Sequence, residues 1–202
     1  MELKLAVGSH GPTRSRLAAA GASRLGQVVE TNWFFDWQDG RLAASGAGLR
    51  IRHAQDRQRR TVATTLTYKG PAPAEANAAR TDRTDQAVIA RPELELAIND
   101  VEIARRLLAA LGMVEILVYQ KRRESWRLGP CRVELDELPQ LGCFVEIEGP
   151  GQEAISQARQ ALGLLEADAV SQSYLALLLE QLPRRGEAGY RIMLGCQHAD
   201  GQ

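Results

Sequence analysis

Pairs of charged residues that alternate with apolar residues recur along this chain and limit most strongly how it can fold. The clearest case is the segment LGCFVEIEG, where Glu146 and Glu148 flank Ile147. Successive side chains of a β-strand point to opposite faces, so the two carboxylates share one face and the apolar residues share the other. The same arrangement recurs at Glu2 and Lys4, Arg50 and Arg52, Glu93 and Glu95, Lys121 and Arg123, and Glu134 and Asp136.

An antiparallel sheet with one solvated face produces such alternation by default, and this is the first interpretation of any single strand. Two features of the whole set favour another interpretation. The pairs are mostly of one sign, and several segments with helical apolar spacing need an apolar surface to cover. If helices cover the apolar face of the sheet, the charged face either meets solvent or curls inward to line a cavity.

The order of the segments predicts an α+β fold. Helices are expected from Pro12 to about Leu25 and at 101–111, 152–162 and 169–182, between strand patterns that run from residue 2 to residue 147. We therefore predict an antiparallel β-barrel or tunnel with a charged lumen, covered by amphipathic helices. One domain spans 1–182, and the pattern dissolves after Pro183, which predicts a flexible tail at 183–202.

Composition limits the partners and the compartment. Lys plus Arg and Asp plus Glu both number 25, so no overall charge favours a nucleic acid polymer or a membrane surface. The three cysteines show no CxxC spacing, which indicates reduced thiols and a cytoplasmic protein. The late apolar run at 175–179 is too short to span a bilayer.

A cavity lined by arginine, lysine and carboxylate side chains suits a triphosphate bound together with a metal ion. Guanidinium groups bind phosphate oxygens in bidentate geometry. Carboxylates repel phosphate directly, but they hold Mg²⁺ or Mn²⁺, which bridges them to the phosphates. The sequence has no GxxxxGK[ST] segment, which excludes a P-loop enzyme.

Seven segments occur in the order of a known family and cover about residues 1–182. They are ELKL, NWFFD with its following GLRIR, LTYKGP, RPELE, QKRRESW, VELD and LGCFVEIEG. Through these seven segments the chain resembles the CYTH family, the triphosphate tunnel metalloenzymes. The resemblance is greatest to the class IV adenylate cyclase branch of that family. The resemblance implies an antiparallel β-tunnel whose lumen binds a nucleoside triphosphate or inorganic triphosphate.

The resemblance also implies roles for the charged pairs. The implied phosphate-binding residues are Lys4, Arg50, Arg52, Lys69, Lys121 and Arg123. The implied ligands of Mg²⁺ or Mn²⁺ are Glu2, Glu134, Asp136, Glu146 and Glu148. Glu2, Lys4 and Glu95 are the candidate catalytic residues, and Glu93 matches a further lumen position.

Three functions follow from the resemblance as alternatives. In the first, the chain converts ATP to cyclic AMP: the ribose 3′-hydroxyl attacks the α-phosphorus and pyrophosphate leaves. In the second, water attacks the γ-phosphorus of inorganic triphosphate, thiamine triphosphate or a nucleotide. The third is a non-catalytic polyphosphate or nucleotide sensor, because only Glu2 and Lys4 fit the family's opening motif, ExExK. A homodimer is a candidate assembly.

Overall fold

The structure is a computed structural model that describes residues 1–56, 61–71, 92–182 and 189–194. Strands and helices alternate irregularly along the chain, as an α+β fold requires. Their bounds are β1 (Glu2–Val7), α1 (Gly11–Ala19), β2 (Ser23–Trp37), α2 (Arg41–Ala44), β3 (Gly48–Asp56), β4 (Thr61–Lys69), β5 (Glu93–Ala97), α4 (Val101–Ala110), β6 (Met113–Leu128), β7 (Cys131–Leu138), β8 (Gly142–Glu148), α5 (Gln152–Ala161), α6 (Tyr174–Gln181) and β9 (Tyr190–Ile192).

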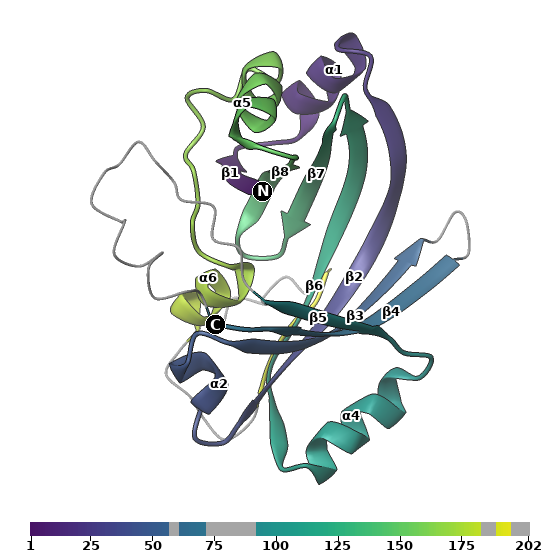
Figure 1. The fold of residues 1–202 in the computed structure, drawn as a ribbon, viewed down its shortest axis with the longest axis vertical. Helices are drawn as coiled ribbons and strands as arrows, with labels where there is room; N and C mark the ends of the chain where they lie inside the picture. The colour runs from purple at the N-terminus through teal and green to yellow at the C-terminus, as the bar shows by residue number, and fades with distance from the viewer. Residues whose placement is uncertain (57–60, 72–91, 183–188, 195–202) are drawn as a thin grey trace, which may run out of the picture.

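These strands form one sheet in the order β1-β8-β7-β6-β2-β3-β4-β5. Every neighbouring pair in that order is antiparallel, and β9 adds to β6 in parallel. The longest strands, β2 and β6, lie side by side through the middle of the molecule and connect its two ends (Figure 1). The α+β class and the antiparallel tunnel wall predicted from the alternation are confirmed.

The sheet curls but does not close into a barrel by strand pairing within the described residues. Its last strands are β1 and β5, and neither pairs with the other. The outer edge of β1 is instead occupied by the segment before α6: the Ala6 amide donates to the Asp168 carbonyl, and the Val170 amide donates to the Lys4 carbonyl. A later segment of the chain therefore satisfies the backbone groups that a closing strand would have used.

Two predicted helices are shorter than their apolar spacing indicated. The first ends at Ala19, because Gly21 adopts a positive φ of 70° and β2 already begins at Ser23. The last begins at Tyr174, where the Ser173 hydroxyl accepts a hydrogen bond from the Ala176 amide at 3.2 Å. The tail predicted after residue 182 contains β9, a strand too short for an alternating pattern to identify.

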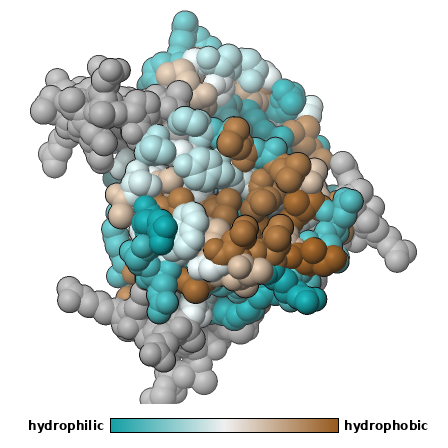
Figure 2. Space-filling model, turned by 60° about the horizontal axis from the view of Figure 1, so that its bottom comes forward, coloured by the Kyte–Doolittle hydropathy of each residue, from teal (hydrophilic) through white to brown (hydrophobic). Residues whose placement is uncertain are grey.

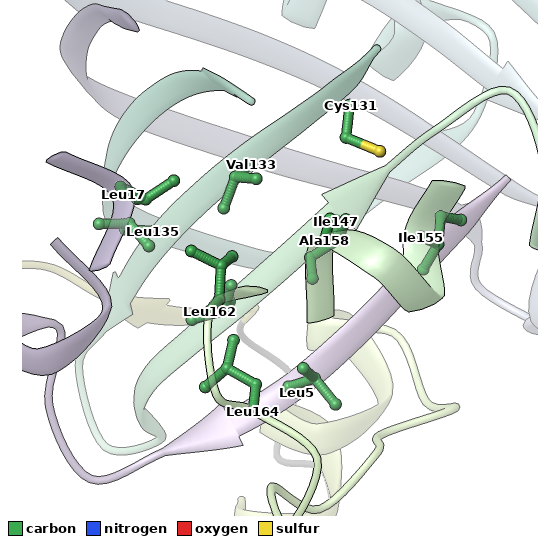
Figure 3. Packing of buried hydrophobic residues seen from close by; sticks show 11 residues of the cluster. Leu5, Leu17, Cys131, Val133, Leu135, Ile147, Ile155, Ala158, Leu162 and Leu164 are labelled. Carbon is green, nitrogen blue, oxygen red and sulfur yellow. The ribbon is translucent and has the colours of Figure 1, made fainter. Parts of the chain in front are cut away.

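Helices α1 and α5 cover the outer face of β1, β8 and β7 at one end of the molecule (Figure 1). Figure 3 shows the core between them, in which side chains from the strands meet side chains from both helices. Leu5, Leu17, Val133, Ile147 and Leu162 are fully buried there. This is the packing expected when the apolar face of the sheet is covered.

Helix α6 packs on the opposite face, which is the face that carries the charged pairs; we call it the inner face. Together with β9 it covers an apolar cluster formed by Leu117, Tyr119, Leu138, Phe144, Tyr174, Leu178 and Ile192. The expectation that every helix would cover the apolar face is therefore wrong for α6. At the α6 end, the inner face is apolar and is covered by α6 and β9. The rest of the inner face carries the charged pairs.

Helix α4 lies at the far end of the molecule from α1 and α5 (Figure 1). Asp100 caps its first turn by accepting a hydrogen bond from the Ile103 amide at 2.9 Å. Leu108 packs against Phe35, Ile51 and Met113 in a third apolar cluster. Among the described residues, no helix is both long and apolar enough to cross a membrane.

Candidate functional site

The register of the antiparallel strands gathers the predicted charged pairs on the inner face. Across β1 and β8, Lys4 lies opposite Glu146, and Glu2 lies opposite Glu148. Residues that face each other across neighbouring antiparallel strands point to the same side of the sheet. The remaining inner-face neighbours follow: Glu134 with Glu146, Asp136 with Arg123, Lys121 with Glu30, Arg50 with Thr67, and Lys69 with Glu93.

Asp136 lies at the centre of this face and is fully buried. Its carboxylate accepts hydrogen bonds from Lys121 Nζ at 2.8 Å and from Arg123 Nε at 2.7 Å. Arg123 also binds Glu146. Burial alone would raise the pKa of Asp136, but Lys121 and Arg123 lower it well below its ordinary value. Asp136 is therefore a fixed anion that orients two cations.

Tyr174 connects α6 to this centre. Its hydroxyl donates to Asp136 Oδ2 at 3.0 Å, while Lys4 Nζ lies 4.3 Å and Lys121 Nζ 5.0 Å from the centroid of its ring. Burial, and then the charges of Asp136 and Glu146, raise the pKa of Tyr174 far above its ordinary value, so the phenol keeps its proton. Lys4 also donates to the Gln172 carbonyl at 3.0 Å, which fixes its ammonium group.

Glu30 is a member of this site that the sequence patterns did not single out. It is almost fully buried on β2, with Oε2 3.5 Å from Lys121 Nζ and 3.7 Å from Arg52 Nε. Burial opposes its ionisation, but Lys121, Arg123 and Arg52 together lower its pKa to about 2. The only signal was its spacing: Glu30 and Asn32 are two residues apart, with Val29 before them and the aromatic residues Trp33, Phe34 and Phe35 after them.

Arg50 and Arg52 extend along β3 as two like charges on the inner face. Burial, and then the neighbouring Arg52, lower the pKa of Arg50. Arg52 forms its ion pair with Glu30, whereas Arg50 has no carboxylate within 4.0 Å among the residues that the structure describes. An anion bound between these guanidinium groups would relieve both the burial of charge and the repulsion.

Carboxylates gather at the end of the face formed by β1 and β8. Burial, and then the charge of Glu146, raise the pKa of Glu2; Lys4 opposes this and Glu148 adds to it. Lys69 on β4 also lowers the pKa of Glu2, although β1 and β4 lie far apart in the strand order. The sheet thus curls far enough for its two ends to face each other across the inner face.

The predicted residues on the last strands line the rim of this space. Lys69 Nζ lies 3.4 Å from a Glu93 carboxylate oxygen, and both side chains are about half exposed. Glu95 accepts a hydrogen bond from the Thr67 hydroxyl at 2.9 Å, and Thr67 itself is buried on the inner face. Lys69, Glu93 and Glu95 therefore join the site from the side opposite Glu2.

The carboxylates differ in how free they are to bind a cation. Glu134 accepts a hydrogen bond from the Ser125 hydroxyl at 2.5 Å and is also bound by Arg132, and Asp136 is bound by Lys121 and Arg123. Within the described residues no three His, Cys, Asp or Glu side chains already stand close enough together to hold a metal ion. Glu146 is likewise bound by Arg123 and lies 3.6 Å from Lys4 Nζ, so Glu2 and Glu148 are the freer carboxylates. Glu2, Glu146 and Glu148 supply the oxygen donors that Mg²⁺ and Mn²⁺ prefer, and their mutual repulsion favours a bound cation.

The arrangement combines cations for an anionic ligand with a carboxylate wall suited to a metal ion. Arg50, Arg52 and Lys69 line one side, while Glu2, Glu146 and Glu148 line the other. Lys4, Lys121 and Arg123 lie between them in a largely buried network of ion pairs that orients their side chains. Such a preorganised set is suited to bind phosphate groups and to stabilise charge that moves between them.

Comparisons with known proteins agree with this geometry. The model of the CYTH domain matches residues 1–174. The "Putative adenylate cyclase MJ0240" of Methanocaldococcus jannaschii is 23% identical over 186 residues, which cover 88% of this chain and 97% of that protein.

Two solved structures are similar over almost their whole length. The PH1819 protein from Pyrococcus horikoshii has a TM-score of 0.70 and 26% identity, with 90% of this chain and 98% of that one covered. HpAC1 from Hippeastrum, described as a putative adenylyl cyclase with a dominant triphosphatase activity, has a TM-score of 0.63 and 19% identity over 89% and 94% of the two chains. The matched domain model, which extends over most of the chain, shows that this protein belongs to the CYTH domain family.

Proposed function

We propose that this protein is a metal-dependent enzyme that acts on a triphosphate. The leading reaction is that of a class IV adenylate cyclase, in which the ribose 3′-hydroxyl of ATP attacks the α-phosphorus and pyrophosphate leaves. The alternative is a triphosphatase that hydrolyses inorganic triphosphate, thiamine triphosphate or a nucleoside triphosphate. Both reactions need the same phosphate-binding groups and differ in what positions the nucleophile.

The environment of Arg50 is the observation that best supports this proposal. Arg50 is a half-buried cation with a lowered pKa, it lies beside Arg52, and among the described residues it has no carboxylate partner. A buried charge without a counter-ion is costly, and phosphate oxygens are the anions that guanidinium groups bind best. Lys69, Lys121 and Arg123 on the same face would contact further phosphate oxygens.

We propose that Glu2, Glu146 and Glu148 hold Mg²⁺ or Mn²⁺. A divalent cation there would neutralise charge on the phosphate oxygens and draw them toward the carboxylate wall. Glu134 and Asp136 would support this wall from neighbouring positions by fixing Arg132, Lys121 and Arg123. Removal of divalent cations would then leave the phosphates facing carboxylates directly.

We propose Glu2, Lys4 and Glu95 as the catalytic residues. Lys4 is held 3.6 Å from Glu146 and can donate to the departing phosphate oxygens. Neither Glu2 nor Glu95 has an ion-pair partner within 4.0 Å in the described part of the chain, so each is free to accept the proton of the attacking hydroxyl or water.

The names of the relatives support both reactions. The protein from Methanocaldococcus jannaschii carries an adenylate cyclase name, whereas HpAC1 is described as having a dominant triphosphatase activity. Product analysis is therefore needed to distinguish the cyclase reaction from the triphosphatase reaction. Purified protein is incubated with ATP and, separately, with tripolyphosphate, each with Mg²⁺, with Mn²⁺ or with EDTA, and the products are separated by anion-exchange chromatography.

Each product identifies one reaction. Cyclic AMP with pyrophosphate supports the cyclase, while ADP with orthophosphate, or orthophosphate and pyrophosphate from tripolyphosphate, supports the triphosphatase. Binding without any product favours the non-catalytic sensor. Equal turnover in EDTA would contradict the metal requirement, and the absence of both binding and turnover would contradict the proposal as a whole.

We also propose that the protein forms a homodimer through an apolar surface at the α4 end. Figure 2 shows this surface as a broad apolar area on the face that carries α4 and β5. Its most exposed members, each at least 60% exposed, are Leu94, Leu96, Ile103, Leu107 and Leu111. Monomeric proteins rarely expose a patch of this kind, which marks an interaction surface.

A second copy of this chain fits the surface best. Ile103, Leu107 and the C-cap residue Leu111 recur every four residues along one side of α4. Strand β5 is the last strand of the sheet, so its outer backbone edge has no strand partner among the described residues. A two-fold related copy presents the same stripe and the same edge, so it would cover both.

We propose a cytoplasmic location for the protein. Cys131 and Cys143 are free thiols, which supports this location.

A further inference from the structure

Four buried side-chain atoms of the described residues have no hydrogen-bond partner, and all four lie in one part of the inner face. They are Glu30 Oε2, Asn32 Nδ2, Asn32 Oδ1 and Arg52 Nε. Glu30 and Asn32 are two residues apart on β2, and Asn32 lies directly opposite Arg52 on β3. The nearest approach among them, Arg52 Nε to Glu30 Oε2, is 3.7 Å, too long for a hydrogen bond.

Asn32 is the most informative of these residues. Its side chain is fully buried, yet neither the donor nor the acceptor of its amide is used. A buried polar group without a partner costs about 1–3 kcal/mol, and an apolar side chain of the same size would avoid that cost. Buried polar groups in folded proteins are almost always satisfied, so a partner from outside the chain is expected at Asn32.

Asn32 has charged neighbours on one side and aromatic neighbours on the other. Glu30, with Lys121 opposite it, lies on the side of the ion network. On the other side lies Phe34, and Tyr119 lies directly across from Asn32 on β6. The rings of Phe34 and Tyr119 are stacked, with centroids 5.8 Å apart. Asn32 thus stands where the charged part of the inner face meets an aromatic wall.

The chemistry of the four atoms limits what can satisfy them. Asn32 Nδ2 and Arg52 Nε are donors, whereas Asn32 Oδ1 and Glu30 Oε2 are acceptors. An ionised triphosphate offers only acceptors, so it can satisfy the two donors and leaves the two acceptors bare. A group with a donor beside an acceptor can satisfy both kinds, as a ribose hydroxyl or the amine and ring nitrogen of an aminopyrimidine edge does.

We propose that Asn32, with Glu30, forms a subsite for the organic half of the substrate, next to Arg52 and the site for its phosphates. This inference rests on the proposed function and narrows its substrate class to a triphosphate ester whose organic half carries adjacent hydrogen-bond donors and acceptors. Inorganic triphosphate then binds without engaging Asn32. Asn32 is the residue that gives a nucleoside triphosphate its advantage over inorganic triphosphate.

The test compares three ligands on matched variants by isothermal titration calorimetry. Wild type, Asn32→Leu and Asn32→Ala are titrated in EDTA, where metal-dependent turnover does not occur, with α,β-methylene-ATP, thiamine triphosphate and tripolyphosphate. Leucine keeps the branched shape of asparagine but removes its amide, and alanine controls for a steric effect of the larger leucine. Thr31→Val on the same strand, whose side chain points to the other face, is the matched control, and thermal melts check that each variant is folded.

Both Asn32 variants are expected to bind α,β-methylene-ATP or thiamine triphosphate roughly 10-fold more weakly than wild type, the loss typical of one or two buried hydrogen bonds. A loss with α,β-methylene-ATP indicates that the organic half is a nucleoside, whereas a loss with thiamine triphosphate indicates that it is thiamine. Their tripolyphosphate affinity stays within about twofold of wild type.

An equal loss for all three ligands would overturn the inference, because Asn32 would then contact phosphate, and so would unchanged affinity for all three. In either case the wild-type protein still binds tripolyphosphate and the proposed function stands. If wild type binds none of the ligands either in EDTA or with Mg²⁺, the proposed function itself fails.

Discussion

At the scale of single residues, the buried charges of the inner face are held by one another. Asp136 and Glu30 each contact Lys121, and Arg123 lies next to both. Such buried groups remain charged only because their partners outweigh the cost of removing them from water. Loss of one partner would leave the others as uncompensated charges, so stability and the binding site depend on the same contacts.

Glu30 makes the stability of the protein depend on pH. Its pKa of about 2 lies below the ordinary 4.5, so its ionised form stabilises the folded state above pH 4.5, and this stabilisation is lost as the pH falls toward 2. Glutamine cannot ionise. We expect the gap in free energy of unfolding between wild type and Glu30→Gln to narrow by roughly 2 kcal/mol between pH 6 and pH 3, measured by urea unfolding at fixed protein concentration. A gap that stays constant over this range would contradict the assigned pKa.

The sequence predicted the charged pairs of the site because alternation alone places them on one face. Arg50 and Arg52, or Glu146 and Glu148, needed only the period of a β-strand. Glu30 and Asn32 were not identified because aromatic neighbours made their strand look like ordinary core. Their environment depends on which strands become neighbours, and that information lies in the strand order, which the alternation of one strand does not contain.

At the scale of the elements, the outer core fixes the wall that carries the carboxylates. Leu162 at the end of α5 is fully buried among side chains of α1 and the strands (Figure 3). Leu162→Ala removes buried methyl groups and leaves a cavity, so we expect a loss of about 3 kcal/mol in the free energy of unfolding. Leu165, which is 54% exposed, is the matched control, and Leu165→Ala should change stability by less than about 0.5 kcal/mol. Equal effects of the two substitutions in urea unfolding would contradict the described packing.

Element type was predictable from periodicity, but element length and placement were not. The first helix stopped early because Gly21 adopts a left-handed conformation, a choice that the neighbouring alanines did not indicate. Helix α6 packs on the inner face because Tyr174 reaches Asp136, whereas its apolar spacing only required some apolar surface. Tertiary contacts decided both outcomes.

At the scale of the whole molecule, the apolar surface at the α4 end implies assembly. Leu107→Glu places a charge within this surface, so we expect the protein to change from dimer to monomer in light scattering coupled to size-exclusion chromatography. Leu165→Glu, which changes an exposed leucine outside the surface, should leave the mass unchanged. A wild-type protein that is monomeric at micromolar concentration, or a Leu107→Glu variant that remains dimeric, would contradict this assembly.

The central claim is that the inner face binds a triphosphate, and Arg52 tests it most directly. Calorimetric titration of tripolyphosphate compares wild type with Arg52→Ala and with Arg122→Ala, an exposed arginine on the other face that pairs with Glu137. Loss of a charge-assisted contact to phosphate predicts affinity at least about 10-fold weaker for Arg52→Ala and unchanged affinity for Arg122→Ala. Absence of binding to wild type, or equal affinities for all three proteins, would contradict the claim.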